Sequence, residues 1–507
     1  MSLPHWEKYV FYGVILLNTI PVFCFDFFPT MDGPAHLYNV QLIRELLSDE
    51  SFTGIFFEMR NIIVPNWFGH GILLFYGSFL SPSWAEKLML ITFMAALPLS
   101  FHYFLQRLKY TLNGLPQTSL AVYLIFPLSY SMSLHYGFYN FSFGLVFLFL
   151  TLGYFFHSYA NMNNKKGVFL GVLLLFTYLS HFFVFGLLLV FILMSYIVLY
   201  FTKNEYRTIK DFFATGIRYI VYFSPALFLC AIYLSVFTLG GASSYIEKTE
   251  LLNWLVHARP LIYFEENEFS KFFFFAIVIW SIILIFNYYK RKVFSYGAKL
   301  MFLFLGFMFV LYFLLPNETS SAGFISIRLL TLFFLFWIAT ISLMKVNRYF
   351  ALSLVIAALF IHIKITDKFI KNGQTYSDLA AEIVDVSKLL KNNPIVLPIN
   401  ASNDWMKAHF SNYLGLEQSV VILDNYEASN SYFPVGWKEF SVERILEEKM
   451  GTCLKFDPSI LPYYPHYNYI FILKGGEKVN DYHQLLEDKN WQNLYDSKNV
   501  SLWRLEQ

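Results

Sequence analysis

The chain has 507 residues, of which 57% are hydrophobic and only 14% are charged. A soluble protein of this length needs polar surfaces over several domains, and roughly a quarter of its residues are normally charged. The formal net charge of +2 provides no basic surface for a nucleic-acid partner. The composition therefore excludes a soluble enzyme and a nucleic-acid-binding protein, and predicts a protein that crosses a membrane several times.

Charged residues are unevenly distributed along the chain. Residues 1–363 carry 38 of the 72 charged side chains, whereas the last 144 residues carry the other 34. This step predicts two domains: a transmembrane domain over residues 1–365 and a water-soluble domain over residues 366–507. The long loop after the first span, residues 26–83, is expected to lie on the outer face of the membrane.

Apolar stretches long enough to cross a hydrocarbon core of roughly 30 Å recur through the first domain. They cover residues 9–25, 84–106, 117–134, 141–159, 167–201, 216–239, 271–289, 299–316, 327–344 and 349–365. The stretch 167–201 is too long for one span and is expected to form two helices that meet at Ser180 and His181. The predicted fold is mostly α, a bundle of about eleven transmembrane spans.

Lysine and arginine set the expected orientation. If the N-terminus is cytoplasmic, one set of connecting loops collects fifteen basic residues and the opposite set collects seven. The excess of basic residues marks the cytoplasmic side. An odd number of spans then makes the C-terminal domain extracytoplasmic, and the first span is expected to be retained as a signal anchor.

The first outer loop contains the most informative motif, DGPAHLYN, which begins at Asp32. An amphipathic helix is predicted over residues 35–47. Asp32 and His36 are four residues apart, so they share one helix face if the helix begins near Asp32. Asp32 has an alternative role as the N-cap of this helix, which would explain its residue type without any chemistry.

Other ionisable residues are predicted on the same outer face. They are His135 in a tight aromatic turn, His181 between two spans, Arg328 at the start of a span, and Arg259, Glu265 and Glu266 in the loop 240–270. Each lone histidine has an alternative role as a hydrogen-bonded side chain at the membrane interface. An arginine at a span end can likewise extend its charged group to the interface without binding a ligand.

The segments DGPAHLYN, GFYNFSFGL and LSHFFVFG resemble those of bacterial GT-C-class integral-membrane glycosyltransferases of an uncharacterised subfamily. The resemblance covers most of the membrane domain. It implies a GT-C-like fold, a location in the bacterial inner (cytoplasmic) membrane, and transfer of a sugar from a polyprenyl-phosphate donor to a glycan, lipid or protein acceptor.

Within this resemblance, Asp32 matches the loop carboxylate that serves as general base, and His36 is the residue expected to orient it or share its proton. Arg328 or Arg259 is expected to hold the donor phosphate. His181, His135, Glu265 and Glu266 are further candidates for substrate contacts. Many members carry two neighbouring acids in the loop, but here only Asp26 lies nearby, so a divalent cation such as Mg²⁺ or Mn²⁺ stays open.

Two other functions remain as alternatives. A transporter or flippase of lipid-linked glycans would be expected to show ionisable residues near mid-membrane and an internal repeat, and neither is visible. A non-catalytic assembly protein derived from the same fold is the other alternative, because a fold alone does not establish chemistry.

The last domain is predicted to be α/β and extracytoplasmic. Helices are expected at 376–390, 405–414, 442–449 and 481–489, and strands at 395–399, 420–423, 467–473 and 500–505. The turn-rich stretch 424–437 carries four large aromatic residues. These rings either stack on sugars or anchor the loop to its own domain.

Overall fold

The computed structural model describes most of the chain. The described residues are 5–48, 51–113, 120–203, 208–236, 242–262, 268–291, 296–319, 322–343, 348–438, 467–475, 483–484, 486–487 and 491–505. They form two compact units, each with its own core. Unit 1 comprises residues 1–21, 91–135 and 139–371, and unit 2 comprises residues 22–90, 136–138 and 372–507.

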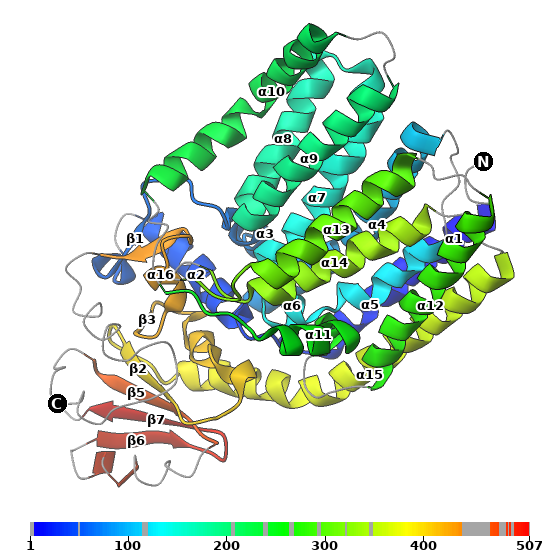
Figure 1. The fold of residues 1–507 in the computed structure, drawn as a ribbon. Helices are drawn as coiled ribbons and strands as arrows, with labels where there is room; N and C mark the ends of the chain where they lie inside the picture. Colours follow the sequence, from blue (N-terminus) through cyan, green and yellow to red (C-terminus); the bar gives the residue numbers. More distant parts are fainter. Residues whose placement is uncertain are drawn as a thin grey trace. The chain divides into compact units, whose positions relative to one another are not determined.

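Unit 1 is built of helices (Figure 1). They are α1 (His5–Thr19), α5 (Ile125–Ser129), α6 (Met132–His135), α7 (Tyr139–Ser158), α8 (Asn164–Ser180), α9 (Phe182–Lys203), α10 (Ile209–Val236), α11 (Lys248–Val256), α12 (Glu268–Arg291), α13 (Tyr296–Leu314) and α14 (Ile325–Ser342). Short 3-10 segments cover Leu120–Leu124, Tyr159–Asn161 and Arg259–Leu261. Two long helices, α4 (Pro82–Asn113) and α15 (Arg348–Ser387), run from one unit into the other.

Within the described residues, six helices are long and apolar enough to cross a membrane: α4, α7, α9, α10, α13 and α14. Shorter apolar helical segments cover Tyr9–Cys24, Leu120–His135 and Phe269–Ile283. The chain is therefore an integral membrane protein, as its composition predicts, and the count of about eleven spans stays a prediction. The predicted break at Ser180 and His181 is confirmed, because α8 ends at Ser180 and α9 begins at Phe182.

Aromatic packing and small residues hold the helices of unit 1 together. In α14, 83% of the apolar segment is buried within the protein. The Phe336 ring of this helix packs against Phe149, Phe191 and Phe304. Helices α8 and α10 approach closely at Gly171, where an added Cβ would overlap the backbone carbonyl oxygen of Tyr222. Small residues allow this approach because no side chain separates the two backbones. Close packing of this kind holds helices together in a membrane, where the surrounding lipid provides no hydrophobic driving force for association.

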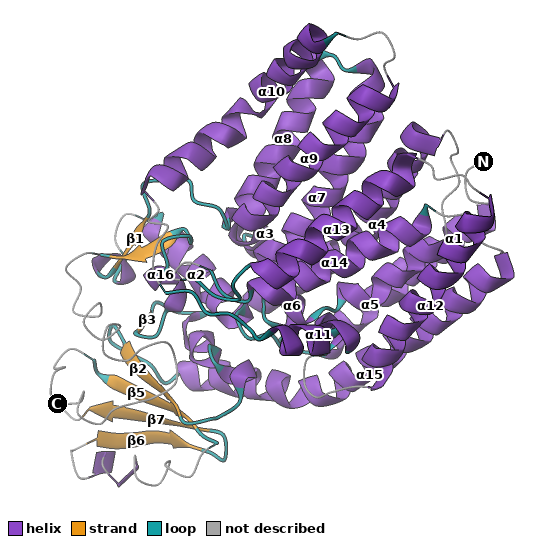
Figure 2. Ribbon diagram, viewed as in Figure 1, coloured by secondary structure: helices purple, strands orange, loops and turns teal. Residues whose placement is uncertain are grey.

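Unit 2 combines the first long loop with the C-terminal part of the chain. The loop contributes α2 (Gly33–Leu46), a 3-10 turn (Thr53–Ile55), β1 (Phe57–Met59) and α3 (Trp67–Gly77). The C-terminal part contributes β2 (Ile395–Asn400), 3-10 turns (Trp405–Lys407 and Phe410–Gly415), β3 (Val421–Ile422), α16 (Tyr426–Ser429), β4 (Val435–Trp437), β5 (Tyr469–Leu473), β6 (Trp491–Asp496) and β7 (Val500–Leu505). Figure 2 shows the strands gathered in this unit.

The larger sheet has five strands in the order β3–β2–β5–β7–β6. Strands β3, β2 and β5 are parallel, and β7 and β6 continue the sheet antiparallel. The predicted strands at 395–399, 420–423, 467–473 and 500–505 are confirmed, whereas β6 was not predicted. The predicted helix 405–414 is instead two 3-10 turns. The predicted helix 442–449, and most of 481–489, lie outside the described residues.

The first outer loop shares a core with the C-terminal segments. The Tyr38 hydroxyl donates to the Val420 carbonyl (2.7 Å), and Asn39 and Asn425 exchange two side-chain amide hydrogen bonds of 3.0 and 3.1 Å. Strand β1 pairs antiparallel with β4. Residue 365, the predicted domain boundary, lies inside the continuous helix α15, and residues 22–90 group with the C-terminal part because these contacts unite them.

The close approach of α8 and α10 predicts an asymmetric response to two otherwise similar substitutions. Gly171→Ala should destabilise the protein by about 1–3 kcal/mol, because the new methyl group forces the two backbones apart. Gly186→Ala on α9 is the matched control, since nothing lies within 4 Å of an added Cβ there. Thermal unfolding of the purified protein in detergent measures both, and equal unfolding temperatures would contradict the packing described for α8 and α10.

Candidate functional site

Helix α2 begins immediately after Asp32, which occupies the N-cap position. The backbone N–H of Asp32 donates to the Tyr136 carbonyl (3.2 Å), and its carbonyl accepts the His36 N–H (3.0 Å). The carboxylate makes no capping hydrogen bond to the helix, although it is only 6% exposed. A side-chain capping bond therefore does not account for Asp32, whose carboxylate lies at the positive end of the helix, where a negative charge is favourable.

A glycine turn fixes the backbone around Asp32. Gly137 has a φ of +79°, a conformation that residues with a side chain rarely adopt. A Cβ added to Gly137 would lie 2.8 Å from the Cβ and from the backbone nitrogen of Asp32. The Gly137 carbonyl also bonds His36 Nε2 at 2.9 Å. The DGPAHLYN and GFYNFSFGL motifs therefore meet at this turn, and a side chain at position 137 would be strained.

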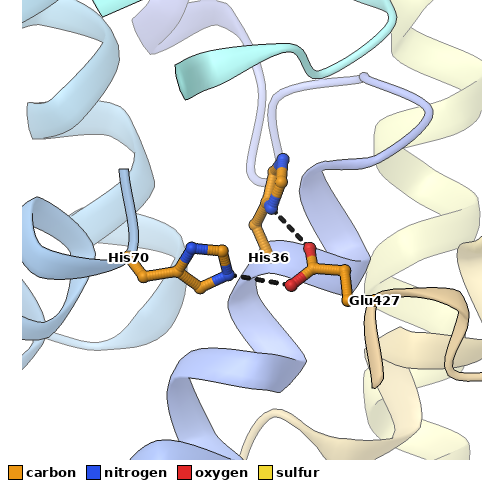
Figure 3. Close-up of side chains that lie close together, drawn as sticks. All are labelled: His36, His70 and Glu427. Atoms are coloured by element: carbon orange, nitrogen blue, oxygen red, sulfur yellow. Dashed lines mark hydrogen bonds and ion pairs between the residues drawn. The ribbon is translucent and has the colours of Figure 1, made fainter. Parts of the chain in front are cut away.

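His36 takes part in a buried cluster with His70 and Glu427. His36 Nδ1 lies 2.5 Å from Glu427 Oε1, and His70 Nε2 lies 2.8 Å from Oε2. Figure 3 shows the carboxylate facing both imidazole rings, with one oxygen turned to each. The rings are nearly perpendicular, and the three residues come from α2, α3 and α16. The ligand atoms of these three side chains lie close enough together to bind one metal ion. No second group of histidine, cysteine or acidic side chains with this geometry is found among the described residues.

The cluster shifts the pKa values of Glu427 and His36 in opposite directions. Burial alone would raise the pKa of Glu427, but the charges of His36 and His70 and their hydrogen bonds outweigh it, so the pKa is held below its usual range. Burial alone would lower the pKa of His36, but Glu427, Asp32 and the Gly137 carbonyl together raise it. Both effects favour an ionised carboxylate facing a positively charged partner.

The segment that carries Glu427 is tied down by hydrogen bonds within unit 2. The Asn425 side chain caps α16 through the Ala428 N–H (3.4 Å) and also binds Asn39 on α2. The guanidinium of Arg60 donates to three backbone carbonyls that follow Glu427 in the chain, those of Ala428, Asn430 and Phe433. These bonds place a short, four-residue helix accurately enough to aim one side chain.

Two further side chains surround Asp32. His409 Nε2 lies 3.6 Å from Asp32 Oδ1, which is too long for a hydrogen bond. The His409 ring stacks on Tyr426 with 4.2 Å between centroids. Burial lowers the pKa of His409 to about 4, so its ring is neutral at pH 7. Burial and the carboxylate of Asp32 together raise the pKa of Tyr426, which keeps its hydroxyl protonated.

The other predicted candidates lie in unit 1, where two of them come together. The Phe141 ring contacts both His181, with 5.4 Å between centroids, and Arg328, whose guanidinium lies 5.8 Å from the ring centroid. His135 is instead fully buried, 4.2 Å from the Phe369 ring. Arg259 lies 5.8 Å from the Trp254 ring. Glu265 and Glu266 lie outside the described residues.

Sequence reasoning did not identify Glu427, His70 or His409 as site residues. His70 lies in the first outer loop without a recognisable motif around it, and Glu427 lies in the aromatic loop 424–437. That loop is anchored on its own unit: the Phe433 ring packs against His36 and His70, and Trp437 stacks on Phe57. The contacts join residues more than 350 positions apart, so no local pattern could reveal them.

Comparison with known proteins shows which solved structure has a similar fold. No protein-family model matches the chain, and no curated protein matches it by sequence. Among solved structures, the chain is similar to ArnT from Cupriavidus metallidurans, whose crystal structure contains bound undecaprenyl phosphate. The TM-score is 0.58 at 9% sequence identity, and the match covers 98% of this chain and 97% of ArnT. The predicted GT-C-like fold is thereby confirmed.

The turn at Gly137 gives a test of how Asp32 is positioned. Gly137→Ala should lower the stability by about 1–3 kcal/mol, because alanine disfavours a positive φ and its methyl group overlaps the Asp32 backbone. Gly71→Ala in the same unit is the control, because nothing lies within 4 Å of an added Cβ there. Thermal unfolding in detergent measures both variants. An unchanged unfolding temperature for Gly137→Ala would show that the turn does not constrain Asp32.

Proposed function

We propose that this protein is a membrane glycosyltransferase that moves a sugar from a polyprenyl-phosphate donor to an acceptor hydroxyl, with Asp32 as the general base. One observation carries the proposal: a chain with the fold of ArnT, a membrane glycosyltransferase, places a buried carboxylate that does not serve as a helix cap directly after its first apolar helix. The ArnT structure with undecaprenyl phosphate supports a polyprenyl-phosphate lipid as the partner.

In the proposed step, the acceptor oxygen attacks the anomeric carbon of the donor sugar. The bond between that carbon and the phosphate oxygen breaks, and Asp32 takes the proton of the acceptor hydroxyl. The polyprenyl phosphate leaves with the bonding electrons as a phosphate anion. Because this leaving group is already a weak base, the reaction needs a base for the acceptor more than an acid for the departing oxygen.

The departing phosphate needs a cation that stabilises its charge. We assign this role to Arg328, whose planar guanidinium can bind two phosphate oxygens at once. Arg328 contacts Phe141, and Phe141 also contacts His181. Phe141 and His181 belong to two of the motifs that resemble GT-C sequences, so this cationic side chain lies beside both motifs. Arg259, which lies beside Trp254, is the alternative for the same role.

The proposal includes the setting of the reaction. The protein lies in the bacterial inner membrane with its N-terminus in the cytoplasm, and the reaction takes place on the outer face with a glycan, lipid or protein acceptor. The orientation follows from the basic residues of the loops. A flippase would move the same lipid without changing it, so chemical analysis of the lipid distinguishes the two functions.

Asp32→Asn should lower the rate of sugar transfer by about 10²-fold or more, because the amide cannot take a proton. Asp26→Asn is the matched control, an exposed aspartate six residues earlier in the same loop. The measurement is mass spectrometry of envelope glycans and polyprenyl lipids from a strain that lacks the wild-type gene and expresses each variant. Full activity of Asp32→Asn at normal protein level would refute the assignment.

Arg328→Gln should weaken binding of undecaprenyl phosphate by about tenfold or more, because charge-assisted bonds to phosphate are lost. Arg328→Lys keeps the positive charge but loses the paired donors, so its affinity for undecaprenyl phosphate should lie between those of the wild type and Arg328→Gln. Native mass spectrometry or fluorescence titration with undecaprenyl phosphate measures binding, with Arg259→Gln beside them. If only Arg259→Gln weakens binding, the phosphate role belongs to Arg259.

A further inference from the structure

We propose that His36, His70 and Glu427 bind a zinc ion. The ligand atoms of the three side chains lie within 4.8 Å of one another. All three residues are almost fully buried, with exposures of 4%, 1% and 0%. The inference uses residues of unit 2 alone and does not depend on the proposed glycosyl transfer.

The outer nitrogens of both imidazole rings define the proton positions. His36 Nε2 faces the Gly137 carbonyl oxygen at 2.9 Å, and His70 Nδ1 faces the Asn66 carbonyl oxygen at 3.1 Å. A carbonyl oxygen only accepts, so each of these nitrogens carries a hydrogen. Histidine ligands of metals almost always donate their other N–H in this way, which fixes the tautomer and the ring orientation.

The inner nitrogens then require positive charge. In the neutral tautomer, His36 Nδ1 and His70 Nε2 each present a lone pair, and each faces an oxygen of Glu427 that is also an acceptor. Two lone pairs cannot face each other at 2.5–2.8 Å without a cation between them. Two protons can provide this charge, one in each nitrogen–oxygen contact. A single divalent metal ion provides it for both contacts, because all three side chains can bind the same ion.

The identity of the donor atoms selects the metal. Two imidazole nitrogens and one carboxylate form the ligand set of many zinc sites, and Mg²⁺ prefers oxygen ligands alone. Two histidines therefore favour Zn²⁺ over the Mg²⁺ or Mn²⁺ left open by the sequence. Three protein ligands also leave the fourth tetrahedral position of zinc for water or a substrate oxygen.

Entry of the ion requires a small movement. Zinc–ligand distances of about 2.0 Å at tetrahedral angles place neighbouring ligand atoms roughly 3.3 Å apart. The nitrogen–oxygen distances here are 2.5 and 2.8 Å and the ligand atoms all lie within 4.8 Å of one another, so the ligand atoms must shift by up to about 1.5 Å. Side-chain rotations of Glu427 and the two histidines would provide this movement, while the main chain around Glu427 stays held by Arg60 and Asn425.

Metal binding would join three segments that are distant in sequence. His36, His70 and Glu427 lie on α2, α3 and α16, and a shared ion would cross-link the first loop to the C-terminal part of the chain. Binding to the folded state alone stabilises that state. The same ion would also hold α2 one helical turn from Asp32, so it would position the proposed base.

The test uses the full-length protein purified in detergent. After removal of metals with a chelator and dialysis, Zn²⁺ is added back, and bound metal is counted by mass spectrometry alongside the unfolding temperature. We expect about one zinc per chain and a higher unfolding temperature with the metal. His70→Gln and Glu427→Gln should bind zinc at least about tenfold more weakly.

His257→Gln is the matched control. His257 Nδ1 bonds the Asn253 carbonyl four residues earlier, as His70 Nδ1 bonds that of Asn66, but His257 is not in the cluster. It should bind zinc like the wild type. Cobalt substitution of the wild type covers the case in which the cluster variants do not fold, because Co²⁺ in a four-coordinate site absorbs visible light strongly.

The outcomes separate clearly. Stoichiometric zinc in the wild type, lost in the cluster variants but retained in His257→Gln, supports the site. A wild type that takes up neither zinc nor cobalt and unfolds at the same temperature with and without them overturns the proposal, and assigns the cluster to proton-bound histidines. Zinc retained in both cluster variants also overturns it, because the metal is then bound elsewhere.

Discussion

The buried carboxylate of Glu427 is the constraint on which unit 2 depends. A charged carboxylate removed from water costs several kcal/mol unless cationic or hydrogen-bonding partners replace its hydration. His36 and His70 supply these partners, one to each oxygen. Neither partner is near Glu427 in sequence. The carboxylate is therefore stabilised only when α2, α3 and α16 are packed together in the folded state.

This constraint extends to Asp32. His36 lies one helical turn after Asp32, and its other ring nitrogen binds the carbonyl of Gly137. The same glycine packs against the Asp32 backbone, so the start of the helix, the turn and the imidazole ring are in direct contact. His36 therefore acts on Asp32 through electrostatic attraction and through the backbone, while its nitrogens are engaged by Gly137 and Glu427.

The likeness to ArnT at 9% identity shows that the fold can persist while almost every side chain changes. Membrane helices permit this, because many apolar side chains satisfy the same packing and lipid contacts. The residues under tighter physical constraint are fewer: glycines at close backbone approaches, a buried charge and its partners, and a buried carboxylate at the start of a helix. In this chain Asp32, His36 and Gly137 lie in short motifs, whereas His70 and Glu427 join them only through the fold.

The sequence by itself determined the membrane character, the helix break between Ser180 and Phe182, the start of α2 and four strands of the C-terminal sheet. These features are local, since hydrophobic length, helix start signals and strand alternation are visible within a few turns of chain. The tertiary structure alone decided that the first loop shares a core with the C-terminal part, and that His36 faces Glu427 and His70. It also decided that His135 is buried against Phe369, whereas His181 and Arg328 share a contact with Phe141. The physical reason is that a buried ionic contact between residues hundreds of positions apart leaves no periodicity in the sequence, because its energy comes from the exclusion of water in the folded state.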